Sequence, residues 1–342
     1  MTVKKFFKNI VTRLWFIISC ILAFFLLIIN IALAIPTVKS AAELALGRVS
    51  LGGNKTDIEK DYYKRTTKSK DEAREKGDEF NVDIAREGII MLKNKDKAFP
   101  FDIKKEGKKV SVFGKNSVNI VYGGSGSGAV KSDGAKTLAD SLTAVGFEVN
   151  PTLTAFYKDN DKSGTGRDSN PTDLDSGNTV SLATGETPYS SYTSEVKQSY
   201  RDYSDLALII ISRIGGEGFD LPRTSSEEGK HYLEIDQNET EMIRNVVNAG
   251  FKKVALIVNS SNAVELGFAE KGEFADKIDA VYFMPGTGTT GVMALGEILT
   301  GKVNPSGHTV DTFASDFTKA PSFQNFGDNQ KVDGDQFKLD GK

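Results

Sequence analysis

One carboxylate within a glycine-rich stretch is the best candidate for chemistry in this sequence. Glu217 stands between Gly216 and Gly218, shortly after the apolar run 206–211. Such a run is typical of a strand in a parallel sheet covered on both faces, and ligands of open α/β sheets gather at the carboxyl ends of the strands. Glycine lets the backbone turn sharply and lets a ligand approach closely. The pattern predicts a carboxylate presented on a mobile loop; a surface glutamate in a turn is the alternative.

A second glycine-rich stretch, 123–128, contains Ser125 and Ser127. The spacing of its glycines fits a loose dinucleotide-binding fingerprint, but the residues that follow do not open a helix, as that fingerprint requires. Residues 296–303 have phosphate-loop spacing, yet Val303 occupies the position of the Ser or Thr that binds magnesium. We therefore favour a polar, ligand-facing rim for 123–128, with a flexible surface loop and a nucleotide site as alternatives.

Composition argues against several classes of partner. The formal net charge of −3 gives no large basic field, so we expect no nucleic-acid partner. Cys20 is the only cysteine, which rules out an intrachain disulfide and a cysteine-based metal site. The two histidines, His231 and His308, are far apart in the sequence, and their surroundings suggest no zinc site. We interpret both as structural or surface residues, and we expect neither a metal nor a cofactor.

The N-terminal part of the chain predicts a membrane helix. Residues 14–35 are apolar except for Ser19 and Asn30, and about 20 apolar residues in a helix span a bilayer core of ~30 Å. The preceding segment 1–13 is basic and predicts a cytoplasmic N-terminus, with the main domain outside the cell. A cleaved signal peptide is the alternative, because Ala32-Leu33-Ala34 resembles a small-x-small cleavage site. The length of the run favours an uncleaved, single-pass anchor in the cell membrane.

Strand and helix signals alternate over 81–328. The expected strands are 110–113, 147–149, 206–212, 254–259 and 280–284, and the expected helices are 137–145, 236–249 and 288–299. This alternation predicts an α/β domain, a doubly wound and mostly parallel sheet sandwiched by helices and preceded by one transmembrane helix.

Three segments lie outside this alternation. Residues 36–80 predict a juxtamembrane stalk that becomes helical toward 71–86. Residues 151–200 are rich in Ser, Thr, Asp, Asn and Gly and predict a long mobile insertion. The polar residues 329–342 predict a linker-like tail.

Several segments, taken in order, resemble the C-terminal-type α/β-sandwich domain of glycoside hydrolase family 3, which is β-glucosidase-like. They are the helix 85–94, the strand 110–114, the Gly/Ser run 123–128, Gly216-Glu217-Gly218, and the segments 285–286, 301–307, 311–314 and 325–327. The resemblance covers roughly residues 80–328. Their order and spacing, more than any single motif, carry it.

The resemblance implies a retaining glycosidase that cleaves β-glucosides or related substrates. Such enzymes use two carboxyl groups about 5–5.5 Å apart, one as nucleophile and one as acid/base. Glu217 occupies the acid/base position, and Ser125 and Ser127 are expected to face the sugar. Arg213 and Asp220 flank Glu217 and are expected to orient the loop or contact substrate. No cofactor is implied.

The resemblance also implies a partner, because the family's nucleophile is an Asp in a (β/α)₈-type barrel domain. The usual order places the barrel first, but no barrel fits before residue 80, and none follows in this sequence. A domain-swapped or truncated chain fits this order, with a barrel in cis or in trans completing the site. A non-catalytic, membrane-anchored module that binds carbohydrate, or a remnant of an enzyme, is the alternative. In the free domain, Glu217 is expected to stay solvated and mostly ionised.

Overall fold

The computed structural model describes residues 10–45, 66–167, 182–217, 221 and 230–323. The chain divides into two compact units, residues 1–66 and 67–342. The predicted tail 329–342, and Asp220 of the predicted site, lie outside the described residues.

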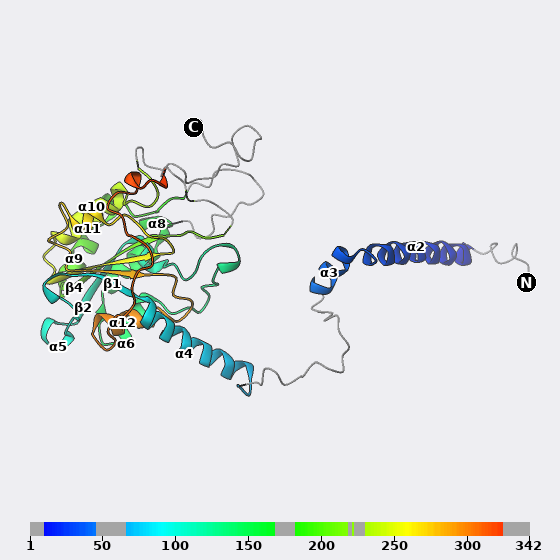
Figure 1. Ribbon diagram of the computed structural model, residues 1–342, viewed down its shortest axis with the longest axis horizontal. Helices are drawn as coiled ribbons and strands as arrows, with labels where there is room; N and C mark the ends of the chain where they lie inside the picture. The colour runs from blue at the N-terminus through cyan, green and yellow to red at the C-terminus, as the bar shows by residue number, and fades with distance from the viewer. Residues whose placement is uncertain (1–9, 46–65, 168–181, 218–220, 222–229, 324–342) are drawn as a thin grey trace, which may run out of the picture. The chain divides into compact units, whose positions relative to one another are not determined.

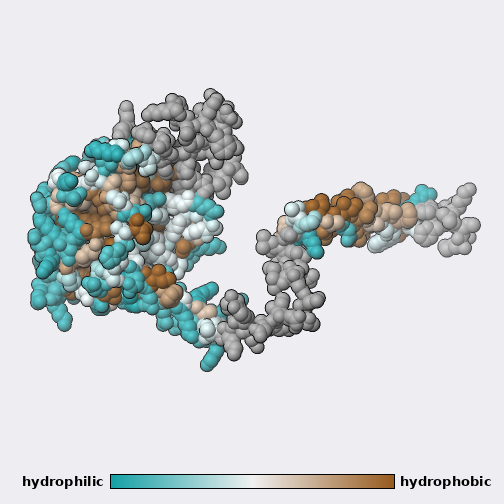
Figure 2. Space-filling model, viewed as in Figure 1, coloured by the Kyte–Doolittle hydropathy of each residue, from teal (hydrophilic) through white to brown (hydrophobic). Residues whose placement is uncertain are grey.

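The first unit contains two helices. α2 (Ile10–Leu33) has 24 residues and none of its side chains is buried, and Figure 2 shows it covered with hydrophobic residues. Its length and composition are those of a helix that can cross a membrane. α3 (Pro36–Ala45) begins with a proline. Proline has no backbone N–H, and the first turn of a helix tolerates it because an N–H there would have no partner within the helix.

The second unit is built on a six-stranded sheet with the order β1-β6-β5-β4-β2-β3. The strands are β1 (Ile90–Asn94), β2 (Lys109–Phe113), β3 (Glu148–Val149), β4 (Leu206–Arg213), β5 (Lys253–Ser260) and β6 (Ala280–Met284). All neighbours pair in parallel except β1, which runs antiparallel to β6. The predicted mostly parallel sheet is therefore confirmed.

Helices cover both faces of this sheet (Figure 1). They are α4 (Lys70–Gly88), α5 (Ile103–Glu106), α6 (Leu138–Ala144), α7 (Pro151–Lys158), α8 (Asn160–Ser163), α9 (Ser194–Asp202), α10 (Gln237–Val247), α11 (Gly267–Glu270) and α12 (Met293–Leu299). Short 3₁₀ turns are η1 (Lys95–Lys97), η2 (Lys115–Val118), η3 (Gly126–Gly128), η4 (Tyr189–Ser191) and η5 (Phe317–Lys319).

Alternate side chains of β4 enter two different cores. Leu206, Leu208 and Ile210 pack with residues of α4, α6 and α12 on one face. Ala207, Ile209 and Ile211 pack with residues of α7, α9, α10 and α11 on the other face. This period of two, with both faces apolar, explains why the run 206–211 has no polar residue.

Local signals placed the ends of α6 and α10 well. Thr137 caps α6, and Asp236 caps α10 in a capping box with Glu239, so both helices begin where the predicted ranges 137–145 and 236–249 begin. The predicted helix 288–299 starts too early: α12 begins only at Met293 and ends at Leu299 as predicted.

The prediction that 151–200 is a mobile insertion is wrong for its described parts. α7, α8, η4 and most of α9 lie within it, and only 168–181 lies outside the described residues. α7 buries Leu153, Phe156 and Tyr157, and α9 buries Val196 and Tyr200. The polar composition concealed this helical spacing of apolar residues, which packs both helices against the sheet.

The predicted stalk 36–80 also extends too far. α4 begins at Lys70, capped by Ser69, and belongs to the second unit. Asn81 donates hydrogen bonds to Thr287 O at 3.0 Å and to Thr290 Oγ1 at 2.9 Å. The domain therefore begins before residue 81.

Candidate active site

The carboxyl ends of β2, β4, β5 and β6 lie side by side at one edge of the sheet, because these four strands are parallel neighbours. The segments that leave them contain Gly123–Gly128, Gly215–Glu217, Ser261–Asn262 and Pro285–Gly288. In open α/β sheets, this edge is where ligands bind. The fold therefore brings both glycine-rich stretches singled out from the sequence to one place.

Glu217 meets the 123–128 loop through three hydrogen bonds. The backbone N–H of Ser127 donates to Glu217 Oε2 at 2.8 Å, and the Ser127 hydroxyl donates to the same oxygen. The Ser125 hydroxyl donates to the backbone carbonyl of Glu217 at 2.8 Å. The structure thus gathers Glu217, Ser125 and Ser127, but both serines contact Glu217, a pairing that the sequence interpretation missed.

Two glycines make this contact possible. Gly126 has a φ of +61°, and a Cβ there would lie 2.7 Å from Glu217 Oε2. A Cβ on Gly216 would lie 2.5 Å from Ser125 Oγ. Such distances are shorter than van der Waals contact, so a larger residue at either position would separate the two loops.

The hydrogen bonds from Ser127 stabilise the ionised form of Glu217. The Ser127 hydroxyl, and then the Ser127 backbone N–H, lower the pKa of this carboxyl, because both donate to its ionised form. The side chain is exposed, so desolvation opposes this only weakly. Glu217 is therefore ionised at neutral pH in this chain, the state expected for the domain on its own.

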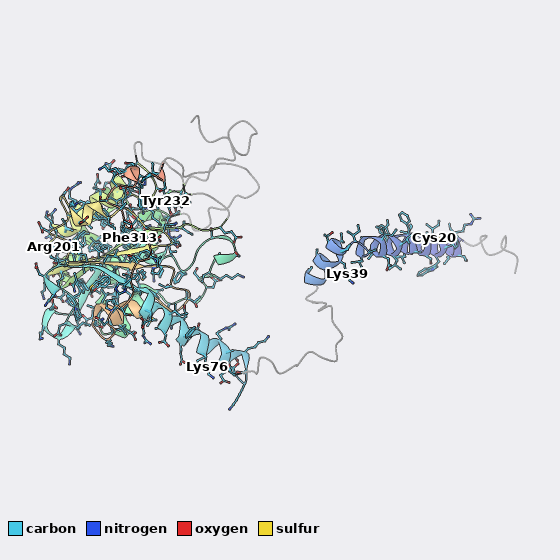
Figure 3. All side chains as sticks on the ribbon, viewed as in Figure 1. Cys20, Lys39, Lys76, Arg201, Tyr232 and Phe313 are labelled. Carbon is cyan, nitrogen blue, oxygen red and sulfur yellow. The ribbon has the colours of Figure 1, made fainter. Side chains whose placement is uncertain are left out.

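Arg213, the last residue of β4, is buried with its side chain only 1% exposed. Its guanidinium donates to both carboxylate oxygens of Glu239 at 2.7 Å. The other donors bind the carbonyls of Ser212, Tyr232 and Glu234 at 2.6–2.9 Å, and Tyr232 is labelled in Figure 3. Burial alone would lower the pKa of Arg213, but the Glu239 carboxylate outweighs it and raises the pKa.

All five N–H donors of Arg213 are thus used within the protein. The expectation that Arg213 contacts substrate is wrong, because its side chain is enclosed and has no donor left. The other expected role, orientation of the loop that holds Glu217, stays a prediction.

Asn259 joins three of the converging segments. Its Oδ1 accepts from Val121 N at 2.6 Å, and its Nδ2 donates to Val121 O at 3.2 Å and to Met284 O at 3.1 Å. In the sequence, the only signal for this joining role was an asparagine at the end of an apolar strand.

His231 pairs with Glu265, a relationship that sequence spacing hides. His231 Nε2 lies 2.8 Å from Glu265 Oε1, and Leu233 N donates to His231 Nδ1 at 3.2 Å. Because Nδ1 accepts, Nε2 carries the proton and donates to Glu265. Glu234 lies close enough to these two residues to form a trio of possible metal ligands; in this structure, Nε2 is hydrogen-bonded to Glu265. The cluster instead holds Phe317, whose backbone N–H donates to Glu265.

Two cavities lie on the described surface of the domain, and one of them borders this edge. One, of about 400 Å³, is lined by Leu221, His231, Asn262, Phe317 and Phe323, among others. It borders the loop of Glu217, because Asn262 packs against Gly215. A larger cavity, of about 610 Å³, lies beside Leu92 and Val281, and its lining contains no residue of the two glycine-rich loops.

The fold and site define the class of protein: an α/β-sandwich domain that presents an ionisable carboxylate at the ligand-binding edge of its sheet. Residues 89–340 match the glycosyl hydrolase family 3 C-terminal domain. The chain belongs to this family.

Two curated relatives agree with this assignment. The chain is 28% identical over 273 residues to beta-glucosidase A of Butyrivibrio fibrisolvens, covering 74% of this chain and 30% of the relative. It is 30% identical over 257 residues to a beta-glucosidase of Ruminococcus albus, covering 74% of this chain and 24% of the relative. The chain therefore spans less than a third of either relative.

Solved structures show the same fold. A beta-glucosidase from Paenibacillus barengoltzii matches with a TM-score of 0.57 and 27% identity, over 73% of this chain and 25% of that one. Beta-glucosidase 3B from Thermotoga neapolitana, solved in complex with glucose, matches with a TM-score of 0.57 and 23% identity, over 74% of this chain and 33% of that one.

Proposed function

We propose that this chain supplies the sandwich half of a retaining, β-glucosidase-like glycoside hydrolase, with Glu217 as its acid/base. The observation that carries the proposal is the exposed Glu217 carboxylate at the carboxyl edge of the sheet. One glycine-rich loop contains Glu217, and the other, 123–128, binds it through Ser125 and Ser127. Membership of family 3 and the beta-glucosidase relatives support the type of reaction.

In such a reaction, Glu217 acts twice. It first donates a proton to the glycosidic oxygen while the C1–O bond breaks and a second carboxylate bonds to C1. It then takes a proton from the water that attacks C1, and the second carboxylate leaves. The products are the free sugar and the alcohol of the leaving group, and both carboxyl groups return to their starting states.

The second carboxylate is proposed to come from a (β/α)₈-type barrel domain, in cis or in trans. Glu217 is exposed and its pKa is lowered in this chain, whereas a general acid needs a raised pKa. A barrel that closes over the sugar would remove water from Glu217 and raise its pKa. The proposed substrate is a β-glucoside or a related β-linked sugar.

The test mixes the full chain, in detergent micelles, with a family 3 barrel domain and measures the rate at which aryl β-glucosides are hydrolysed. Glu217→Gln should lower kcat/KM by about 10²–10⁴-fold for a phenyl glucoside, whose leaving group needs protonation. The loss should be much smaller for a 2,4-dinitrophenyl glucoside, whose leaving group needs none. Glu195→Gln, at an exposed glutamate of α9, is the control and should leave both rates unchanged. Equal phenyl glucoside activity in wild type and Glu217→Gln would refute the assignment.

We further infer that α2 anchors the domain in the cell membrane as a single-pass helix, with the N-terminus in the cytoplasm. The 24-residue apolar helix and the basic residues Lys4, Lys5, Lys8 and Arg13 support this. Mass spectrometry of the mature protein distinguishes an intact N-terminus in the membrane fraction from secretion after cleavage near Ala34.

A further inference from the structure

We propose that Ser127 is a positioning residue, which holds Oε2 of Glu217 and leaves Oε1 as the oxygen that exchanges the proton with the glycosidic oxygen. This inference rests on the proposed function. It adds the residue that orients the acid/base and the oxygen through which the acid/base acts.

The geometry assigns different roles to the two oxygens of Glu217. Oε2 faces two donors of Ser127, its backbone N–H at 2.8 Å and its hydroxyl. A proton on Oε2 would compete with these two donors for the lone pairs of that oxygen, so the hydrogen bonds favour the proton on the other oxygen. Within the described residues, Oε1 accepts no hydrogen bond. The proton of the acid form therefore belongs on Oε1.

The loop that carries Ser127 is itself fixed to the sheet. Asn259 of β5 binds both the N–H and the C=O of Val121, and Gly288 N donates to Tyr122 O at 2.7 Å. Ser125 then holds the backbone of Glu217 at 2.8 Å, while Ser127 holds its carboxylate. The loop that orients the carboxyl group is therefore hydrogen-bonded at its start to β5 and to the segment that follows β6.

Ser127 also lowers the pKa of Glu217. Among the described residues, no charged side chain contributes to the lowered pKa of Glu217; the Ser127 hydroxyl and N–H lower it, and desolvation opposes them. Replacement of Ser127 is therefore expected to change the pKa of Glu217, an effect that a purely structural residue would not have.

The direct test is a pH titration of the Glu217 carboxyl carbon by NMR. It uses the full chain, labelled with ¹³C-glutamate, in detergent micelles, and the Glu217 signal is assigned by its loss in Glu217→Gln. Ser127→Ala should raise the pKa of Glu217, because it removes a donor to the ionised form. Ser127→Thr, which keeps the hydroxyl, should restore the wild-type value.

Ser125→Ala is the matched control, because Ser125 contacts only the backbone carbonyl of Glu217. It should leave the Glu217 pKa unchanged. An unchanged Glu217 pKa in Ser127→Ala, or an equal shift in Ser125→Ala, would overturn the proposal. Circular dichroism checks that each variant folds.

A second measurement uses the mixture of chain and barrel. The basic limb of the kcat/KM profile reports deprotonation of the acid/base, so Ser127→Ala should move it to higher pH, and Ser127→Thr should return it. An unmoved limb would contradict the positioning role. Failure of the proposed function is recognised separately: Glu217→Gln would then keep full activity, whereas the NMR titration would still report the Ser127 bond.

Discussion

Arg213 and Glu239 form a buried ion pair in which Nη1–Oε1 and Nη2–Oε2 are each 2.7 Å, and both side chains are 1% exposed. Arg213 ends β4, and Glu239 lies in the first turn of α10. The same guanidinium binds the carbonyls of Tyr232 and Glu234, where the chain returns from the segment that holds Glu217. One side chain therefore fixes the point at which this segment leaves the sheet and the point at which it returns.

Arg213→Met should lower the free energy of unfolding by about 3–5 kcal/mol, because Glu239 would be left as a buried charge without its partner. Urea unfolding of the full chain in micelles measures the change. Arg244→Met is the control: Arg244 pairs with Glu273 at 2.7 Å, but both side chains are about half exposed, so its loss should cost at most about 1 kcal/mol. Equal costs for the two variants would contradict a structural role of the buried pair.

Gly126→Ala should separate Glu217 from Ser127. The new Cβ would lie 2.7 Å from Glu217 Oε2, at a φ of +61° that alanine disfavours. Because small displacements of a catalytic group reduce rates strongly, we expect kcat/KM of the chain–barrel mixture to fall at least about tenfold.

Gly128→Ala is the matched variant from the same turn. A Cβ at Gly128 would meet nothing within 4 Å, so its kcat/KM should equal that of wild type. The idea fails if the two alanine variants have the same activity.

Glu186 should make the domain less stable as pH rises. Its carboxylate is buried and accepts from Lys115 N at 3.0 Å and Thr187 N at 2.9 Å, yet burial dominates and raises its pKa from 4.5 to about 8. The folded state then binds the proton more tightly than the unfolded state. This contribution to stability is complete below about pH 4.5 and is lost as pH rises to about 8.

Unfolding free energies of wild type and Glu186→Gln, measured from pH 5 to pH 9, test this. The difference between the two proteins should change by up to about 1.4 kcal/mol per pH unit below pH 8, and become constant above it. Groups that titrate equally in both proteins cancel in this difference. Parallel profiles over the whole range would show that Glu186 does not titrate there.

Asn259→Ala should loosen the loop on which Ser127 lies. It leaves the buried Val121 N–H without its acceptor, which costs about 1–3 kcal/mol. Thermal unfolding measures the loss, and limited proteolysis should cut near residues 123–134 faster. Asn245→Ala, which removes one hydrogen bond to Glu241 O on α10, is the control. Cleavage at the same rate in both variants would refute the prediction that Asn259 holds the loop of Ser127.

The sequence by itself determined the elements and the candidate residue. The apolar runs that became β4, β5 and β6, and the capping boxes at Thr137 and Asp236, are local signals, because burial on both faces and helix capping depend on neighbouring residues. The glycines around Glu217 likewise indicated an exposed carboxylate after a strand. Composition misled where polar residues outnumbered a helical apolar face, as in α7 and α9, and where the charged start of α4 resembled a stalk.

Only the tertiary structure decided which residues meet. Ser127 and Glu217 are 90 residues apart, His231 and Glu265 are 34 apart, and each pair meets because the strand order brings separate segments to one edge of the sheet. It also decided that Arg213 is buried against Glu239 and does not face a ligand. The spacing of hydrophobic residues and the helix caps encode where strands and helices form. The order of strands in a sheet depends instead on packing between distant segments, and that order sets which polar groups meet at the site.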